Sequence, residues 1–235
     1  MTPDSIMIFA AGYGTRMREL THDRPKPLVP VAGVAMIDRA LNLVDQAGIK
    51  NRVVNIHYLG DMLKAHLLGR DHLTVVEEPR EALETGGGLR HALPFLGSAP
   101  VFTMNPDAIW TGKNPLTQLA QKWRPREMDA LLLLSPISKA IGHVLGGDFT
   151  SDARYRLRRA EKNNGASYVY TGAQILRTDG LAEVPFEKFS LNLLWDQMIE
   201  RGRLFGCVHD GDWISVGTPE AVKLAEGHLS KTSNV

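Results

Sequence analysis

The first half of the chain alternates short apolar runs with longer amphipathic segments. The runs have the length of buried strands, and between them apolar residues recur with the spacing of helices. The predicted strands span residues 6–11, 52–56, 73–76 and 101–104, and the predicted helices span 36–47 and 59–68. Strands that alternate with helices favour a parallel sheet with right-handed crossovers, in which ligands collect at the carboxyl ends of strands.

The second half has a less regular pattern. It predicts helices at 115–124 and 186–201 and strands at 130–134, 168–175 and 204–208. The stretch 135–149 is rich in glycine and polar residues and yields no assignment. The arginines between 154 and 159 suit a solvated strand edge. Residues 213–220 open a final helix, and a polar tail begins at Gly227.

Composition limits the partners of this chain. Its 235 residues carry a net charge of +1, so no overall field attracts nucleic acid or a membrane surface. The chain has 43% hydrophobic and 23% charged residues, as soluble globular proteins do. No apolar run reaches the length of a membrane-spanning helix. The single cysteine, Cys207, excludes an intrachain disulfide, and we expect a cytoplasmic protein, either a monomer or a homodimer.

The loop after the first strand carries the strongest chemical signal. Gly12 and Gly14 allow backbone N–H groups to approach an anion closely, because no Cβ intervenes. Cationic side chains follow, and they attract phosphate. These cations are Arg16, Arg18, Arg24 and Lys26. The prolines on both sides of Lys26 stiffen its backbone. The loop therefore predicts a site for a nucleoside triphosphate.

Two commoner phosphate motifs are excluded. A dinucleotide fingerprint would need a third glycine where Met17 stands, which also argues against an NAD-linked oxidoreductase. A Walker A loop would need Ser or Thr after Gly112-Lys113, where the chain has Asn114. Two glycines and several arginines alone would suit an ordinary surface turn, but the whole ordered string is far more specific.

Two further segments have site-like chemistry. The glycines at 86–88 open a predicted helix and expose backbone against which a flat heterocycle can lie, although a flexible loop is as good an interpretation of the glycines alone. Asp107 follows the predicted strand 101–104. A carboxylate there can hold Mg²⁺ together with substrate phosphates, or it can form an Asx turn.

The strings AAGYGTRM and PKPLVPVAG resemble the signature of the sugar-1-phosphate nucleotidylyltransferases, the NDP-sugar pyrophosphorylases. Glu19 and Ala35 stand where that signature has proline. The resemblance runs from about residue 6 to 226. It implies a Rossmann-like, mostly parallel mixed sheet flanked by helices, of the nucleotide-diphospho-sugar transferase type. One domain is expected, with a nucleotide-binding half at about 1–110, a sugar-binding half at about 111–226, and the tail at 227–235.

The same resemblance implies a role for each candidate residue. Arg16 and Lys26 are the expected catalytic residues, and Asp107 is the expected Mg²⁺ ligand. The nucleotide is expected to contact Ala11, Gly12, Gly14, Thr15, Glu78, Gly86 and Gly87. The sugar phosphate is expected to contact Asn105, Glu161, Lys162 and Gly172.

Two departures from the family pattern affect the metal site. Pro106 replaces the usual glycine and restricts the backbone of Asn105. Ser215 stands where many relatives have a second metal-binding aspartate, and a hydroxyl is a weaker magnesium ligand than a carboxylate. Asp210 or Asp212 substitutes for it, or a single ion is held by Asp107 and the nucleotide, or activity is reduced.

The short length and the LETGGG segment are most similar to N-acetylmuramate 1-phosphate uridylyltransferases of cell-wall recycling. The resemblance thus implies UTP and a sugar 1-phosphate as substrates and pyrophosphate as a product. Mannose 1-phosphate guanylyltransferase is the alternative enzyme, because a carboxylate at Glu78 accepts an N–H from uracil or guanine alike. A nucleotide-sugar binding or sensing protein with weakened catalysis is the alternative from a different class.

Overall fold

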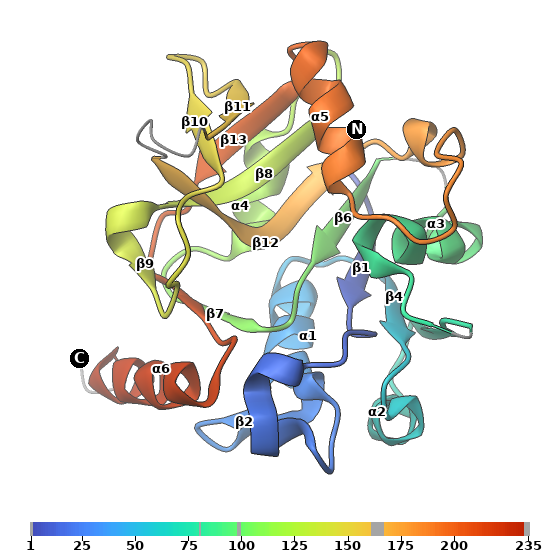
Figure 1. The fold of residues 1–235 in the computed structure, drawn as a ribbon, viewed down its shortest axis with the longest axis vertical. Coiled ribbons are helices and arrows are strands. Elements are labelled where there is room, and N and C mark those ends of the chain that lie inside the picture. Colours follow the sequence, from blue (N-terminus) through green and yellow to red (C-terminus); the bar gives the residue numbers. More distant parts are fainter. Residues whose placement is uncertain (1, 80, 98–99, 161–166, 233–235) are drawn as a thin grey trace.

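The predicted parallel sheet is built around strand β1, Ser5–Phe9. In the computed structural model, which describes residues 2–79, 81–97, 100–160 and 167–232, β1 lies between β4 and β6 and is parallel to both (Figure 1). Strand β4 is Asn51–Ile56 and β6 is Val101–Met104, while β5, Leu73–Glu77, extends the parallel part beyond β4. A continuous apolar run suits β1 because neighbouring strands and helices surround it.

An antiparallel strand makes the sheet mixed. Strand β12, Tyr168–Leu176, pairs antiparallel with β6 and with β8, Ala130–Pro136. Strand β13, Leu204–Val208, runs parallel to β8. Strands β10, Phe149–Ser151, and β11, Leu157–Arg159, complete one edge, so the arginine-rich segment does end a sheet. The expected fold class, a mixed sheet with a parallel centre, is confirmed.

Helices cover both faces of this sheet. One face carries α1 (Met36–Gln46), α2 (Gly60–Leu67) and α4 (Pro115–Lys122), and the other carries α3 (Glu84–Leu96) and α5 (Asn192–Glu200). Because side chains alternate along a strand, Ile6 and Ile8 of β1 pack in the first core and Met7 in the second.

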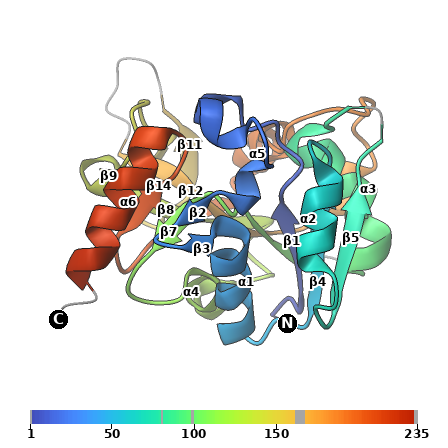
Figure 2. The same cartoon turned by 90° about the horizontal axis from the view of Figure 1, so that it is seen from below.

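A smaller layer brings the ends of the chain together. Strands β7 (Ala108–Trp110), β14 (Trp213–Ser215) and β9 (Ala140–Ile141) form a short sheet, and α6 (Pro219–Thr232) follows it. The N-terminal loop holds two 3₁₀ segments, Thr15–Thr21 and Lys26–Leu28, and the hairpin of β2 (Pro30–Val31) and β3 (Val34–Ala35). Figure 2 shows α6 beside this hairpin.

A third apolar core fixes the loop against the smaller layer. Met17 and Val29 from the loop are buried with Ile214 and Val216 from β14 and the residues after it. Burying such side chains stabilises the contact by about 1.5–3 kcal/mol each. The loop cations therefore have a fixed position relative to the segments that follow β6 and β14.

Several elements differ from their predicted bounds. The helix predicted at 186–201 begins only at Asn192, since the carbonyls of Phe186 and Phe189 accept hydrogen bonds from α3 instead of from a following turn. Residues 213–220 begin with β14, and only then does α6 start; it continues to Thr232, beyond the start of the predicted tail. The unassigned stretch 135–149 contains a 3₁₀ turn, Ile137–Lys139, and β9. One more such turn, Asp179–Leu181, precedes α5.

Two further observations concern the single cysteine and the length of the helices. Cys207 lies buried in β13, within the predicted strand 204–208, and burial raises the pKa of its thiol, which disfavours the thiolate. Across the described ranges, no helix combines the length and hydropathy that crossing a bilayer requires.

Candidate active site

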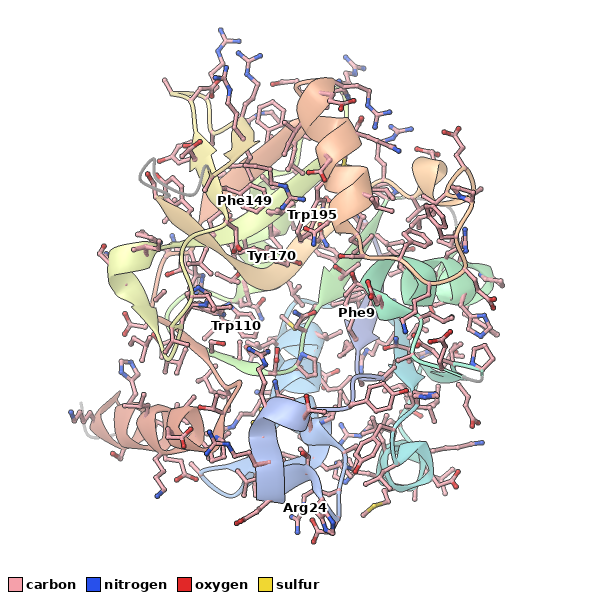
Figure 3. All side chains as sticks on the ribbon, viewed as in Figure 1. Phe9, Arg24, Trp110, Phe149, Tyr170 and Trp195 are labelled. Carbon is pink, nitrogen blue, oxygen red and sulfur yellow. The ribbon has the colours of Figure 1, made fainter. Side chains whose placement is uncertain are left out.

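A cavity of about 310 Å³ opens where β1 and β6 end. Phe9, labelled in Figure 3, is the last residue of β1 and forms part of its wall. The other walls come from the N-terminal loop, the start of α3 and the segment after β6. Among the lining residues are the predicted Ala11, Gly12, Gly14, Thr15, Arg16, Lys26, Glu78, Asn105 and Asp107. Candidates from distant parts of the chain thus share one cavity.

The two loop glycines have different structural roles. Gly14 has a left-handed backbone with φ of 65°, and a Cβ there would lie 2.9 Å from Cβ of Lys26. A side chain at this position would therefore strain the loop and push Lys26 away. A Cβ at Gly12 would meet no atom within 4 Å, so its backbone faces open cavity.

Arg16 lies over the backbone of Gly217, which stands two residues before α6 begins at Pro219. Its guanidinium is 3.5 Å from the place where a Cβ of Gly217 would stand. The side chain is exposed and makes no ion pair with any residue that the structure describes. Its hydrogen-bond donors are therefore available to an anion in the cavity.

Lys26 and Asp107 form an ion pair across the cavity floor. The Nζ of Lys26 donates to Oδ2 of Asp107 over 2.5 Å, and their side chains are 14% and 29% exposed. The flanking prolines shape this approach, because Pro25 is extended and Pro27 belongs to the 3₁₀ turn that carries Lys26. On the other side, the N–H of Val216 donates to the carbonyl of Asp107. The pair joins the N-terminal loop to the end of β6.

The donor set around Asp107 suits a single hard cation. Ser215 lies beside it, since Ser215 pairs with Ala108 across β14 and β7. Among the described residues, no three His, Cys, Asp or Glu side chains gather into a metal-binding group. One carboxylate that faces a phosphate-sized cavity matches the way Mg²⁺ is held, with few protein ligands and several from substrate and water. The residues present therefore fit a divalent ion whose remaining ligands come from phosphates.

The two aspartates considered as substitutes for Ser215 lie elsewhere. Asp210 pairs with Lys113, and this pair lowers the pKa of Asp210. Asp212 hydrogen-bonds to His228 of α6. Neither aspartate lines the cavity.

Asn105 and Gly172, both predicted to contact the sugar phosphate, are neighbours in the structure, but only Asn105 lines the cavity. The N–H of Asn105 donates a hydrogen bond to the carbonyl of Gly172. Gly172 has a φ of 92° and lies where the register between β12 and β8 shifts. A Cβ on Gly172 would lie 3.0 Å from Cβ of Asn105. Glycine thus lets Asn105 keep its place on the cavity wall. Glu161 and Lys162 lie outside the described residues.

Glu78 is held by a buried network that was not predicted. The carboxylate is only 3% exposed, and it accepts hydrogen bonds from the side-chain amide of Asn55 and the N–H of Leu83. Asn55 in turn accepts from the N–H of Ala10 over 2.7 Å. The network ties the ends of β1, β4 and β5 to the segment that leads into α3. A polar residue inside the apolar strand 52–56 was the one sequence signal for it.

The glycines at 86–88 serve packing. Cβ atoms on Gly86 and Gly87 would overlap the Phe189 ring and the Glu187 carbonyl, and both N–H groups donate to the carbonyl of Phe189. A Cβ on Gly88 would overlap the carboxylate of Glu78. Gly86 and Gly87 are buried and are absent from the cavity wall.

At that end of α3, the residues that face the cavity are Glu84 and Thr85. Glu84 has a φ of 59° although it is not glycine, a conformation that costs about 1–3 kcal/mol and often marks a functional segment. Neither residue was predicted, because the glycine run that follows directly after them carries the stronger local signal.

Comparison with known proteins agrees with this geometry. The MobA-like NTP transferase domain matches residues 6–178. The chain belongs to the MobA-like NTP transferase family. It is 39% identical to an N-acetylmuramate alpha-1-phosphate uridylyltransferase of Caulobacter vibrioides, over 97% of this chain and 98% of that one. It is 32% identical to the protein of the same name from Neisseria meningitidis, over 94% and 96% of the two chains.

Other matches of this NTP transferase are more distant. A mannose-1-phosphate guanylyltransferase of Mycobacterium tuberculosis is 27% identical over 91% of this chain and 61% of that protein. A putative glucose-1-phosphate thymidylyltransferase from Bacillus anthracis, solved in complex with a sucrose, shares the fold with a TM-score of 0.78 at 18% identity, over 95% and 94% of the two chains. The resemblance to sugar-1-phosphate nucleotidylyltransferases is confirmed, and the chain is a nucleotidyltransferase.

The packing role of the glycine run can be tested against the open position of Gly12. We expect Gly86→Ala to lower the free energy of unfolding by about 1–3 kcal/mol, because the added methyl group collides with Phe189 and backbone. Gly12→Ala should change it by less than about 0.5 kcal/mol, because its methyl group enters open space. Urea denaturation of both variants measures the difference. Equal stability of the two variants would contradict the packing role.

The Asn55–Glu78 network predicts a pH-dependent stability in one variant. Asn55→Asp keeps the shape but places two carboxylates in one buried site, which raises the pKa of at least one of them above its unfolded value. The folded variant then binds the extra proton more tightly than the unfolded chain, so its stability is present at low pH and is lost as pH rises. We expect a deficit of about 2 kcal/mol at pH 7.5 that narrows at pH 5. A deficit of the same size at both pH values would show that repulsion is not its cause.

Proposed function

We propose that this chain joins UTP and N-acetylmuramate 1-phosphate to form the UDP-sugar and pyrophosphate. The observation that carries the proposal is the convergence of Arg16, Lys26 and Asp107 on one cavity. These residues come from separate segments, and together they supply cations for a triphosphate and a carboxylate for a metal. The relatives of that name, which the chain matches at near full length, support the choice of base and sugar.

The proposed step is an in-line displacement. A phosphate oxygen of the sugar 1-phosphate forms a bond to the α-phosphorus of UTP, while the bond from the α-phosphorus to the bridging oxygen of the β-phosphate breaks and pyrophosphate leaves. The attacking oxygen is already an anion, so no activated Ser or Cys is required. Catalysis then rests on positioning and charge neutralisation.

The loop residues take the triphosphate end of UTP. Backbone N–H groups at Gly12 and Gly14 and the unpaired guanidinium of Arg16 hold the β- and γ-phosphates and the leaving pyrophosphate. The ammonium of Lys26 neutralises charge at the α-phosphate. Gly14 contributes indirectly by letting the loop close on Lys26.

Asp107 is the residue that holds the divalent ion, which we propose is Mg²⁺. When bound, the ion neutralises phosphate charge around the reacting phosphorus. In the structure the ammonium of Lys26 donates to the same carboxylate, so Lys26 and the ion would share Asp107 as a partner. Ser215 contributes at most a hydroxyl.

The base lies at the start of α3 in this proposal. Glu84 and Thr85 line the cavity there, and Glu78 retains acceptor capacity beyond its two hydrogen bonds. Gly86 and Gly87 act by keeping α3 close to the segment 186–190. Asn105, Gly172, Glu161 and Lys162 are assigned to the sugar phosphate, so residues 1–110 mainly hold the nucleotide and 111–226 the sugar. We place the reaction in the cytoplasm, within cell-wall recycling, and assign it to a monomer or homodimer.

Pyrophosphate release from a substrate panel tests this assignment. With Mg²⁺, we expect release from UTP only when N-acetylmuramate 1-phosphate is present, and slower release from GTP with mannose 1-phosphate. A preference for the GTP pair would indicate the guanylyltransferase. Tight UTP binding without pyrophosphate from any pair would indicate the sensing protein that Ser215 makes conceivable.

Alanine variants of two lysines that each form an ion pair with an aspartate test whether Lys26 acts in catalysis. Losing a transition-state contact costs about 3 kcal/mol, so Lys26→Ala should lower turnover about a hundredfold or more. Lys113 pairs with Asp210 on the exposed surface over 2.8 Å, and Lys113→Ala should leave turnover unchanged. Steady-state kinetics on folded samples makes the comparison. Near-normal turnover in Lys26→Ala would remove Lys26 from the mechanism.

A further inference from the structure

A second cavity, of about 650 Å³, lies away from the catalytic one and shares no lining residue with it. It forms where three turns meet. One turn follows α4, one joins β10 to β11, and one leads from α5 into β13. Six arginines line it: Arg124, Arg126, Arg154, Arg156, Arg201 and Arg203. Figure 3 shows nitrogen-tipped side chains gathered at this end of the molecule, around β10, β11 and the start of β13.

Two carboxylates, Asp129 and Asp152, hold some of these arginine side chains in position. Asp129 accepts from Nε of Arg203 over 2.7 Å and lies 3.4 Å from a guanidinium nitrogen of Arg201. Asp152 accepts from the side chain and the backbone N–H of Arg156. These contacts hold the guanidinium groups in place before any ligand arrives, which lowers the cost of binding.

The remaining arginines have unused donors. Arg124, Arg126 and Arg154 are exposed, and their side chains form no ion pair within the described ranges. Glu127 is the acidic residue on the wall. With Asp129 and Asp152 counted as well, six positive charges face three negative ones, so the cavity keeps an excess of positive charge in a chain whose net charge is only +1.

The turns themselves are anchored to the core. The N–H of Gly206 in β13 donates to the carbonyl of Tyr155, and Arg156 forms a β-bridge with Phe205. Trp123, which precedes Arg124, is buried. The turns that carry the arginines are therefore fixed to the core by hydrogen bonds and burial.

The chemistry favours a small polyphosphate over other polyanions. Guanidinium groups bind phosphate oxygens in pairs, and the walls carry arginine without lysine. The lining apolar residues, Met128 and Phe205, are buried, so the site offers no stacking surface for bases and no apolar patch for a membrane. We propose that this cavity binds a di- or triphosphate-bearing small molecule at a site separate from the catalytic cavity.

Calorimetric titration with inorganic tripolyphosphate, at low salt and without divalent ions, tests the proposal. The wild-type protein should bind two equivalents, one in each cavity. Arg124→Glu/Arg154→Glu should bind one equivalent, with affinity at the second cavity reduced at least about tenfold because two charge-assisted contacts become repulsive. The neutral pair Arg124→Gln/Arg154→Gln should give an intermediate loss.

A matched control separates the cavity from net charge. Lys50→Glu/Lys64→Glu makes the same change in charge at exposed residues that line neither cavity, and it should retain both equivalents. In Lys26→Ala, weakening should be confined to the catalytic equivalent, so the result does not depend on which reaction the enzyme performs. One equivalent in the wild-type protein, or the same loss in the lysine control, would overturn the proposal. A single-stranded oligonucleotide that binds the arginine cavity more tightly than tripolyphosphate would overturn it in favour of nucleic acid.

Discussion

The ion pair between Lys26 and Asp107 is the contact on which the site depends. It joins the loop after β1 to the segment after β6, and its members are only 14% and 29% exposed. A partly buried ion pair is held more firmly than a surface pair, because less solvent screens it and each charge would be poorly solvated alone. Removing either residue would leave the other charge mostly buried and without its partner. The structure and the proposed chemistry therefore use the same two side chains.

The surroundings of this pair are arranged by close packing of backbone. Gly14 lets the loop reach Lys26, and Gly172 lets β12 reach Asn105. Met17 and Val29 bury the outer side of the loop against β14. A close-packed interior is stiff, so a change at one packed position displaces its neighbours. Although none of these four residues carries a charge, each therefore helps to fix the cations and the carboxylate relative to one another.

A nucleotidyl transfer of the proposed kind makes modest demands on individual groups. The nucleophile arrives charged and the leaving group departs charged, so the protein must gather positive charge at fixed points. The cavity gathers Arg16, which forms no ion pair within the described residues, Lys26, which is held by Asp107, and the backbone of Gly12, where a Cβ would meet no atom within 4 Å. The second cavity gathers positive charge of the same kind, but its arginines come from three other turns and not from the loop after β1 that carries Lys26.

Local patterns in the sequence determined much of this description. The strand at 101–104 matches β6, and two of the four loop cations, Arg16 and Lys26, share a cavity with Asp107 as their positions after strands suggested. Arg18 and Arg24 do not line it and pair with Glu220 and Asp23. These features are readable because burial sets side-chain periodicity, and because parallel strands bring their carboxyl ends to one edge. The tertiary structure alone decided which residues become partners across the chain. It paired Asn55 with Glu78, packed the glycines of α3 against residues 186–190 ahead of α5, which begins at Asn192, and brought three turns together around the arginines. Such contacts join segments far apart in sequence, and no local spacing encodes the distance between them.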